Sequence, residues 1–407
     1  MREMKDSRIV WIGAIPKRWQ LSKIGSLYTQ RNEKVFDKDY QPLSVTMQGI
    51  LPQLATAAKT DDGDNRKLVR VGDFAINSRS DRRGSCGISP LDGSVSLINI
   101  ILTPRTAMHP GYYNWLFHTT LFADEFYKWG HGIVADLWTT RWQEMKSITV
   151  PVPEYAEQER IAAFLDAECA EINAVLEKTR ASIEEYKKLK QAVIMQAVTK
   201  GVRGDRPMKN SGIEWIGEIS QDFEIVKLKW LCDILDQFRS PVTADKRNQN
   251  ADVLYDYYGA SGAIDKIDSY TIDDHVMLIG EDGANLRMRN LPIMYEINGK
   301  AWINNHAHIL RPKEGVDFHF VFYALEALDL NYYITGSAQP KLSQDNLRNI
   351  WIPITDFSEQ KRIAAYISDV CVGLDRLIAK KQQYLTEIEN YKKSLIYEYV
   401  TGKKEVV

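Results

Sequence analysis

Two segments of the chain carry apolar residues at alternating spacings of four and three. In the second segment the pattern runs from Ile363 to Leu395, with Lys381 as its polar interruption. The pattern in the first segment starts at Ile161 and has three polar interruptions. Heptad spacing over about five heptads predicts a coiled coil rather than an ordinary surface helix. The residues that we expect in its seam are Ile161, Leu165, Ile172, Val175, Ile363, Ile367, Leu374 and Leu377.

The segments that precede these two long helices have a different pattern. Short apolar runs at residues 68–71, 276–279 and 350–352 alternate with turns rich in glycine, asparagine and aspartate, which predicts strands. Residues 112–127 and 318–328 have helical spacing. This mixture predicts α/β domains.

The chain contains an internal repeat, and its two halves have the same order of segments. Residues 4–13 match residues 208–217 at seven of ten positions, and residues 158–164 match residues 360–366. The second match continues without a gap to Thr199 and Thr401. Each half therefore has a shared opening, a middle that does not align, and a shared long ending.

These patterns predict an α+β chain with two tandem α/β domains, each followed by a long helix. The first domain covers residues 1–155 and its helix residues 156–200; the second domain covers residues 208–356 and its helix residues 357–403. A turn-rich linker at residues 201–207 separates the halves. Each long helix has a narrow stripe of apolar residues that must be buried against another helix. We therefore expect the two long helices to pair with each other.

Composition narrows the class of protein. A hydrophobic share of 44% and a charged share of 26% are ordinary for a globular chain. No apolar run reaches the roughly 18 residues of a membrane span, and the charged N-terminus lacks the apolar stretch of a secretory signal. The four cysteines lie far apart without a CxxC pair, which argues against a zinc site or a disulfide scaffold. We expect a cytoplasmic protein.

Known catalytic signatures are missing from the sequence. It has no phosphate loop, no glycine-rich fingerprint after a predicted strand, and no Asn-Pro-Pro or Asp-Pro-Pro followed by an aromatic residue. His306 and His308 are spaced as a possible ligand pair, but no further cluster accompanies them. Glu281 and Asp282 fit a polar turn better than a nuclease carboxylate pair, because no lysine follows closely. We therefore predict neither a catalytic nor a metal site.

The candidate binding residues are clusters of polar and basic residues in segments that contain glycine. The arginine fork suits phosphate oxygens and the O6/N7 edge of guanine, and glutamine suits adenine. Residues 1–155 hold 20 basic against 16 acidic residues, but residues 205–356 hold 15 against 23, which argues against nucleic-acid binding by the second domain unless it binds through local patches. The predicted DNA-binding residues are Asn77, Arg79, Ser80, Arg82, Arg83, His131, Arg141, Asn285, Arg287, Arg289, Asn305, His306, Ser337, Gln339 and Lys341.

The repeated segments resemble the specificity subunit of type I restriction–modification systems. One departure is Ile219-Ser220 in the second opening, where the first has Ile15-Pro16. The segments that carry the resemblance are the two Trp-Ile-Gly openings, Pro151-Val152-Pro153, Glu157-Gln158-Glu159-Arg160-Ile161, Val198-Thr199-Lys200-Gly201 and Val400-Thr401-Gly402.

The resemblance implies a non-catalytic subunit with two target-recognition domains, each binding one half-site of a bipartite double-stranded DNA target. It implies two modification subunits, which are adenine methyltransferases, and ATP-dependent restriction subunits as partners. It also implies that S-adenosylmethionine, ATP and magnesium belong to those partners and that this chain carries no cofactor. No membrane partner is implied.

Two like domains that read opposite strands need an approximate dyad, and a dyad perpendicular to the helices reverses one of them. We therefore expect an antiparallel coiled coil with pseudo-two-fold symmetry. Two alternatives stay open at this point. One is a DNA methyltransferase or nuclease fused to a recognition module, which should carry a cofactor-binding signature. The other is a structural dimerisation protein, which gives no reason for the middles to diverge.

Overall fold

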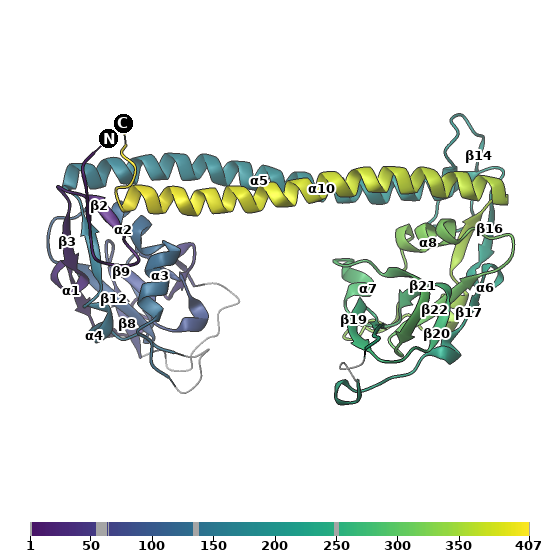
Figure 1. The fold of residues 1–407 in the computed structure, drawn as a ribbon, viewed down its shortest axis with the longest axis horizontal. Helices are drawn as coiled ribbons and strands as arrows, with labels where there is room; N and C mark the ends of the chain where they lie inside the picture. Colours follow the sequence, from purple (N-terminus) through teal and green to yellow (C-terminus); the bar gives the residue numbers. More distant parts are fainter. Residues whose placement is uncertain (1, 54–62, 64, 133–137, 248–251, 407) are drawn as a thin grey trace. The chain divides into compact units, whose positions relative to one another are not determined.

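The computed structural model describes residues 2–53, 63, 65–132, 138–247 and 252–406. The chain forms two compact units. Unit 1 comprises Met1–Arg180 with Gln383–Val407, and unit 2 comprises Ala181–Gln382. The two long helices, α5 (Tyr155–Lys200) and α10 (Phe357–Val400), each contribute to both units (Figure 1). Each unit therefore combines a β-rich domain with one segment of each long helix, and the predicted α+β class is confirmed.

Unit 1 contains small antiparallel sheets and short helices. Among its described residues the sheets have the strand orders β10-β9-β12-β4, β11-β8-β5, β1-β2, β13-β3 and β6-β7. Residues 112–127, expected as one helical stretch, form two helices that meet at Thr119, the N-cap of the second helix. The elements before α5 are β1 (Met4–Asp6), β2 (Ala14–Pro16), β3 (Gln20–Lys23), α1 (Ile24–Leu27), β4 (Tyr28–Arg31), β5 (Lys34–Val35), β6 (Leu43–Thr46), β7 (Gly49–Pro52), β8 (Arg66–Val69), β9 (Phe74–Asn77), η1 (Ser80–Arg82), β10 (Cys86–Ile88), β11 (Gly93–Ser96), β12 (Asn99–Pro104), α2 (Pro110–Phe117), α3 (Thr120–Tyr127), α4 (Trp142–Met145) and β13 (Thr149–Val152).

Unit 2 is built around one larger sheet. The described strands have the order β17-β22-β20-β21-β18-β19, and β14-β15 and β16-β23 form separate pairs. The expected strands at residues 276–279 and 350–352 lie in β20 and largely in β23. The elements before α10 are β14 (Met208–Asn210), β15 (Glu218–Ser220), β16 (Glu224–Lys227), α6 (Leu228–Leu231), β17 (Cys232–Ile234), η3 (Asp236–Phe238), η4 (Ala244–Lys246), β18 (Tyr255–Gly259), β19 (Gly262–Ile267), β20 (Ile272–Gly280), α7 (Asn285–Met288), β21 (Met294–Ile303), β22 (Ala307–Pro312), α8 (Phe318–Ala327), α9 (Gln344–Arg348) and β23 (Trp351–Ile354).

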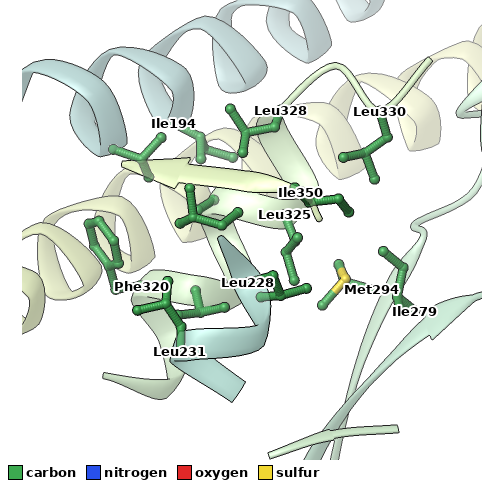
Figure 2. Close-up of a cluster of buried hydrophobic side chains, with 14 of the residues drawn as sticks. Ile194, Leu228, Leu231, Ile279, Met294, Phe320, Leu325, Leu328, Leu330 and Ile350 are labelled. Carbon is green, nitrogen blue, oxygen red and sulfur yellow. The ribbon is translucent and has the colours of Figure 1, made fainter. Parts of the chain in front are cut away.

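Each unit has its own apolar core, to which both long helices contribute. In unit 1 the core is rich in aromatic rings, such as Phe74 and Phe117, whose centroids lie 4.6 Å apart. In unit 2 the core is mostly aliphatic, and Figure 2 shows Ile194 of α5 among side chains such as Leu228 and Phe320. Burial of these side chains stabilises each β-rich domain together with its helix segments.

The segments of α5 and α10 pair in an antiparallel orientation inside each unit, as predicted. Partner numbers on α10 fall as those on α5 rise. In unit 1 the pairs are Phe164 with Tyr399, Asn173 with Lys392 and Arg180 with Glu389; in unit 2 they are Tyr186 with Lys381 and Lys190 with Asp375.

The seam between the helices is shifted by one residue at two of the eight predicted positions. Val175 and Leu377 are 40% and 43% exposed, so neither occupies the seam that we expected. Their neighbours Leu176, which is buried, and Ile378, which is half-buried, take these places. Val175 and Leu176 are both apolar, and so are Leu377 and Ile378. The heptad pattern therefore fits a seam through either residue of each pair, and packing against the partner helix decides which residue is buried.

Candidate nucleic-acid interface

In unit 1 the structure joins the two basic clusters that the sequence separates. The backbone of Ser80 donates a hydrogen bond to the carbonyl of Trp138, 2.9 Å away, and Thr140 donates to Ser78, 3.0 Å away. Thr139 also exchanges two backbone hydrogen bonds with His131, of 3.0 and 3.1 Å. We call this meeting of residues 78–80, 138–140 and 131 the first junction.

Three cationic side chains surround a cavity at the first junction. Arg79, Arg141 and Lys67 line a hollow of about 280 Å³, together with polar groups of Ser78 and Thr139. Burial lowers the pKa of Lys67, whose ammonium donates to the carbonyl of Asn99. Lys67 was not among the predicted residues, because in the sequence it stands in a strand remote from the arginine cluster. The arrangement offers donors to an anionic or base-edge acceptor.

The other predicted side chains of unit 1 differ in their exposure. The side chains of Arg82 and His131 are each 69% exposed. Arg83 pairs with Asp124, and its guanidinium lies over the ring of Tyr127. Asn77 is buried, and its side chain accepts from the backbone of Arg79, so it shapes the loop.

Unit 2 brings its three predicted clusters together in the same way. Leu342 donates to the carbonyl of Glu281, 2.7 Å away, and Gly283 donates to that of Pro340, 3.0 Å away. Lys341 exchanges two backbone hydrogen bonds with Thr335, of 2.8 and 2.9 Å. We call this meeting of residues 281–283, 340–342 and 335 the second junction, and residues 335–341 the second hairpin.

The two junctions are equivalent, although the middles of the two halves do not align in sequence. The same four backbone hydrogen bonds recur, with Ser78 and Glu281, Trp138 and Pro340 as corresponding positions. Isolated β-bridges join Arg79 to Thr139, Asp282 to Lys341, His131 to Thr139 and Thr335 to Lys341. The duplication therefore extends into the divergent regions as a shared backbone frame that presents different side chains.

The exposed polar groups of the second junction are concentrated on the second hairpin and beside it. Ser337 and Gln339 are exposed at its tip. The ammonium of Lys341 lies 3.0 Å from Glu281. The ring of His306 lies 2.8 Å from a carboxylate oxygen of Asp282, and Asn305 is exposed next to it.

Three other predicted residues of unit 2 make contacts inside the domain. Arg289 donates to the carbonyls of Glu326 and Leu328, and burial lowers its pKa. The amide of Asn285 donates to two carbonyls of its own loop. Arg287 is exposed but donates to the carbonyls of Ile334 and Gly336, which links α7 to the second hairpin. These residues shape the surface rather than extend from it.

A buried ionic cluster lies below the second hairpin, and the sequence did not predict it as part of the site. His308 is buried between Asp236 and the carbonyl of Leu342, at 2.7 and 2.8 Å. Burial alone raises the pKa of Glu281, but hydrogen bonds from Arg239 and Lys341 bring it below its usual value. Burial also opposes ionisation of Asp236, but its contacts with His308, the Ile309 N–H and Gln344 together lower its pKa. Only the tertiary structure brings these residues together.

The described residues lack two kinds of feature. No group of three or more histidine, cysteine, aspartate or glutamate side chains is arranged to hold a metal ion within the described ranges. No helix in the described part of the chain is both long and apolar enough to cross a membrane.

Comparisons with known proteins agree with the duplicated frame. Residues 220–390 match the family model "Type I restriction modification DNA specificity domain". A putative type I restriction enzyme specificity subunit of Haemophilus influenzae, S.HindORF215P, is 28% identical over 159 residues, which cover 39% of this chain and 37% of that protein. The MjaVIII specificity subunit of Methanocaldococcus jannaschii is 27% identical over 282 residues, covering 64% of this chain and 63% of that protein.

The chain thus aligns with less than two thirds of the length of these relatives. A solved structure concerned with complex assembly and conformational transition of the type I R-M system is similar in fold. It has a TM-score of 0.73 at 14% identity and covers 96% of this chain and 99% of that chain. The family-model match and the two relatives thus make this chain similar to type I restriction–modification specificity subunits, and the solved structure shows the same fold.

Proposed function

We propose that this chain is the DNA specificity subunit of a type I restriction–modification complex. Each unit binds one half-site of a bipartite double-stranded DNA target. Unit 1 reads its half-site through Arg79, Arg82, His131 and Arg141, and unit 2 reads the other through the second hairpin with Asn305 and His306. Such a surface places donors and acceptors against base edges and phosphates.

The observation that carries this proposal is the pair of equivalent junctions. Both units form the same four backbone hydrogen bonds, but Arg79 in unit 1 corresponds to Asp282 in unit 2, and Thr139 corresponds to Lys341. A shared frame with different exposed chemistry suits two half-sites of different sequence. A protein whose only role is dimerisation does not require this difference.

The partners that we propose bring the catalysis. They are two modification subunits, which methylate adenine with S-adenosylmethionine, and restriction subunits, which use ATP and magnesium. We place the complex in the cytoplasm, where the host DNA is. In this account the chain itself binds the DNA target, recruits the modification and restriction subunits and positions them on the DNA.

The test is a gel-shift assay on the chain assembled with its modification subunits. A duplex that carries both half-sites should bind more tightly than one with either half scrambled, by about 10³-fold or more at physiological salt. Equal affinity for all duplexes would remove the specificity role and leave non-specific phosphate binding.

A second assay separates this proposal from a fused enzyme. Homogeneous chain, free of modification subunit, is incubated with DNA and labelled S-adenosylmethionine, and transfer of the methyl group to DNA is measured. We expect no transfer until the modification subunit is added. Turnover by the chain alone would favour the fused methyltransferase instead.

A further inference from the structure

We infer that Glu281 and His308 are positioning residues that hold the second hairpin in the geometry needed to discriminate bases in its half-site. This inference rests on the proposed function and deepens it for unit 2. Neither side chain is placed to meet DNA itself, since Glu281 and His308 are both buried. Their action is through Lys341 and Leu342, at the end of the hairpin.

His308 fixes the backbone at the base of the hairpin. It stands on β22, and both of its ring nitrogens face acceptors, namely the carboxylate of Asp236 and the carbonyl of Leu342. These two contacts link the ring to η3 on one side and to the residue that follows the second hairpin on the other. A carboxylate oxygen of Glu281 lies 3.8 Å from Nε2 of the same ring.

Glu281 holds the hairpin from the other side. Its backbone carbonyl accepts from Leu342, so residue 342 is held at both its N–H and its carbonyl. One carboxylate oxygen pairs with the ammonium of Lys341, and the other accepts from Arg239. The direction of the Lys341 side chain is therefore set by a buried group, while its 54% exposure leaves other ammonium donors accessible to DNA.

The first junction shows that these charges are not required to build the frame. Ser78 occupies the position of Glu281, and its hydroxyl donates to the carbonyl of Ile98. The hydroxyl of Thr140, at the position of Leu342, donates to the carbonyl of Phe126. Neutral hydrogen bonds give the same four-bond arrangement in unit 1. The ionic cluster in unit 2 therefore has a role beyond forming the junction.

The second hairpin is a segment in which small displacements matter. Gly336 has a φ of 82°, and a Cβ there would lie 2.3 Å from the carbonyl oxygen of Gln339, so the turn is tight. Gln339 projects from this turn, and the hairpin is exposed from Thr335 to Gln339. Readout of a base edge requires a side chain held within a fraction of an ångström. A buried charged support can supply that restraint.

The experiment uses the full chain assembled with its modification subunits, and it measures methylation of a DNA library randomised at each half-site. The test variant is Glu281→Gln, which keeps the shape of the side chain but removes its charge. We expect discrimination against single mismatches in the unit 2 half-site to fall about tenfold, with the unit 1 half-site unchanged. Glu296→Gln is the matched control, because Glu296 also contacts two side chains in unit 2, His275 and His319, away from the hairpin.

Two substitutions of Lys341 keep the inference testable if Glu281→Gln does not fold. Lys341→Arg keeps an ion pair with Glu281 and should retain base discrimination. Lys341→Met should lower it in the unit 2 half-site. If Lys341→Met weakens binding to all sequences equally, Lys341 is a phosphate contact only and the inference is wrong.

The remaining outcomes also separate the two proposals. Unchanged discrimination in Glu281→Gln, or equal loss in both half-sites with a lowered melting temperature, contradicts a positioning role while the proposed function stands. A parent complex without any sequence preference contradicts the proposed function, and the inference falls with it.

Discussion

Two buried glutamines, Gln158 and Gln360, occupy equivalent positions in the first turns of the long helices. Gln158 accepts from the backbone of His109 and donates to the carbonyl of Pro153. Gln360 accepts from Asp317 and donates to the carbonyl of Thr355 in the same way. Each amide thereby joins a long helix to the N-terminal cap of a domain helix, α2 or α8. This explains physically why the repeated ending contains glutamine.

Replacing Gln360 by alanine should destabilise unit 2. The change leaves the Asp317 N–H and the Thr355 carbonyl without their partner, at a cost of about 1–3 kcal/mol for each group that stays buried. Urea unfolding gives the total loss, and hydrogen exchange should place the loss of protection in unit 2. Gln158→Ala should act on unit 1 in the same way. Gln191→Ala, at an exposed position of α5, should change stability by less than about 0.5 kcal/mol.

Arg82 is the most exposed guanidinium of the first predicted cluster. If it contacts a base, Arg82→Ala should weaken binding of the assembled complex by about 1–3 kcal/mol and relax only the unit 1 half-site. Arg180→Ala is the control, since Arg180 is also exposed in unit 1 but pairs with glutamates on the long helices. A uniform loss across sequences in a binding titration would instead assign Arg82 to a phosphate.

At the residue scale, the sequence indicated candidate polar and basic segments, but not which of them meet or what each side chain does. The spacing of arginines marks residues 79–83, part of which lies in the first junction, and residues 287–289, of which Arg287 donates to the carbonyl of Gly336 in the second hairpin. It does not distinguish exposed Arg82 from Arg289, because the two are equally polar in sequence and only packing turns Arg289 toward backbone carbonyls. Glu281 and His308 were interpreted as polar-turn and strand residues for the same reason.

At the scale of elements, the seam between α5 and α10 uses one of two neighbouring apolar residues at Val175–Leu176 and at Leu377–Ile378. Leu176 is 5% exposed in unit 1, whereas its neighbour Val175 is 40% exposed. The heptad pattern predicts the helices and their pairing, but both phases satisfy it. The choice between them arises from contacts with the other helix and with the domain, which the local pattern does not contain.

The seam assignment predicts different costs for two adjacent substitutions. Leu176→Ala should cost about 2–5 kcal/mol, because it removes buried methyl groups and leaves a cavity. Val175→Ala should cost less than about 1 kcal/mol, because its side chain is largely in water. Denaturant unfolding monitored by circular dichroism measures both. Equal losses in the two variants would mean that the seam runs through both positions.

At the scale of the whole molecule, α5 and α10 are the helices that belong to both units. We propose that their length sets the gap between the half-sites. Duplicating residues 181–184 in α5 and residues 379–382 in α10 adds about 6 Å to each helix. At about 3.4 Å per base pair, the preferred gap should grow by one or two base pairs. A four-residue insertion is accommodated as a stutter, so the pairing should persist.

The readout for these insertions is the methylated sequence. The bases of both half-sites should stay the same, because neither junction is altered. A gap that does not change, or new bases in either half-site, would show that something other than helix length controls the spacing.

The central claim is that this chain supplies the DNA sequence preference of a type I complex through its two units. The most direct measurement is genome-wide methylation mapping in cells that express the chain with its modification subunit. We predict one bipartite motif with a fixed gap, which disappears when the chain is omitted and changes in one half-site when either junction is altered. Methylation that is independent of this chain, or a single continuous motif unaffected by both junctions, would contradict the account.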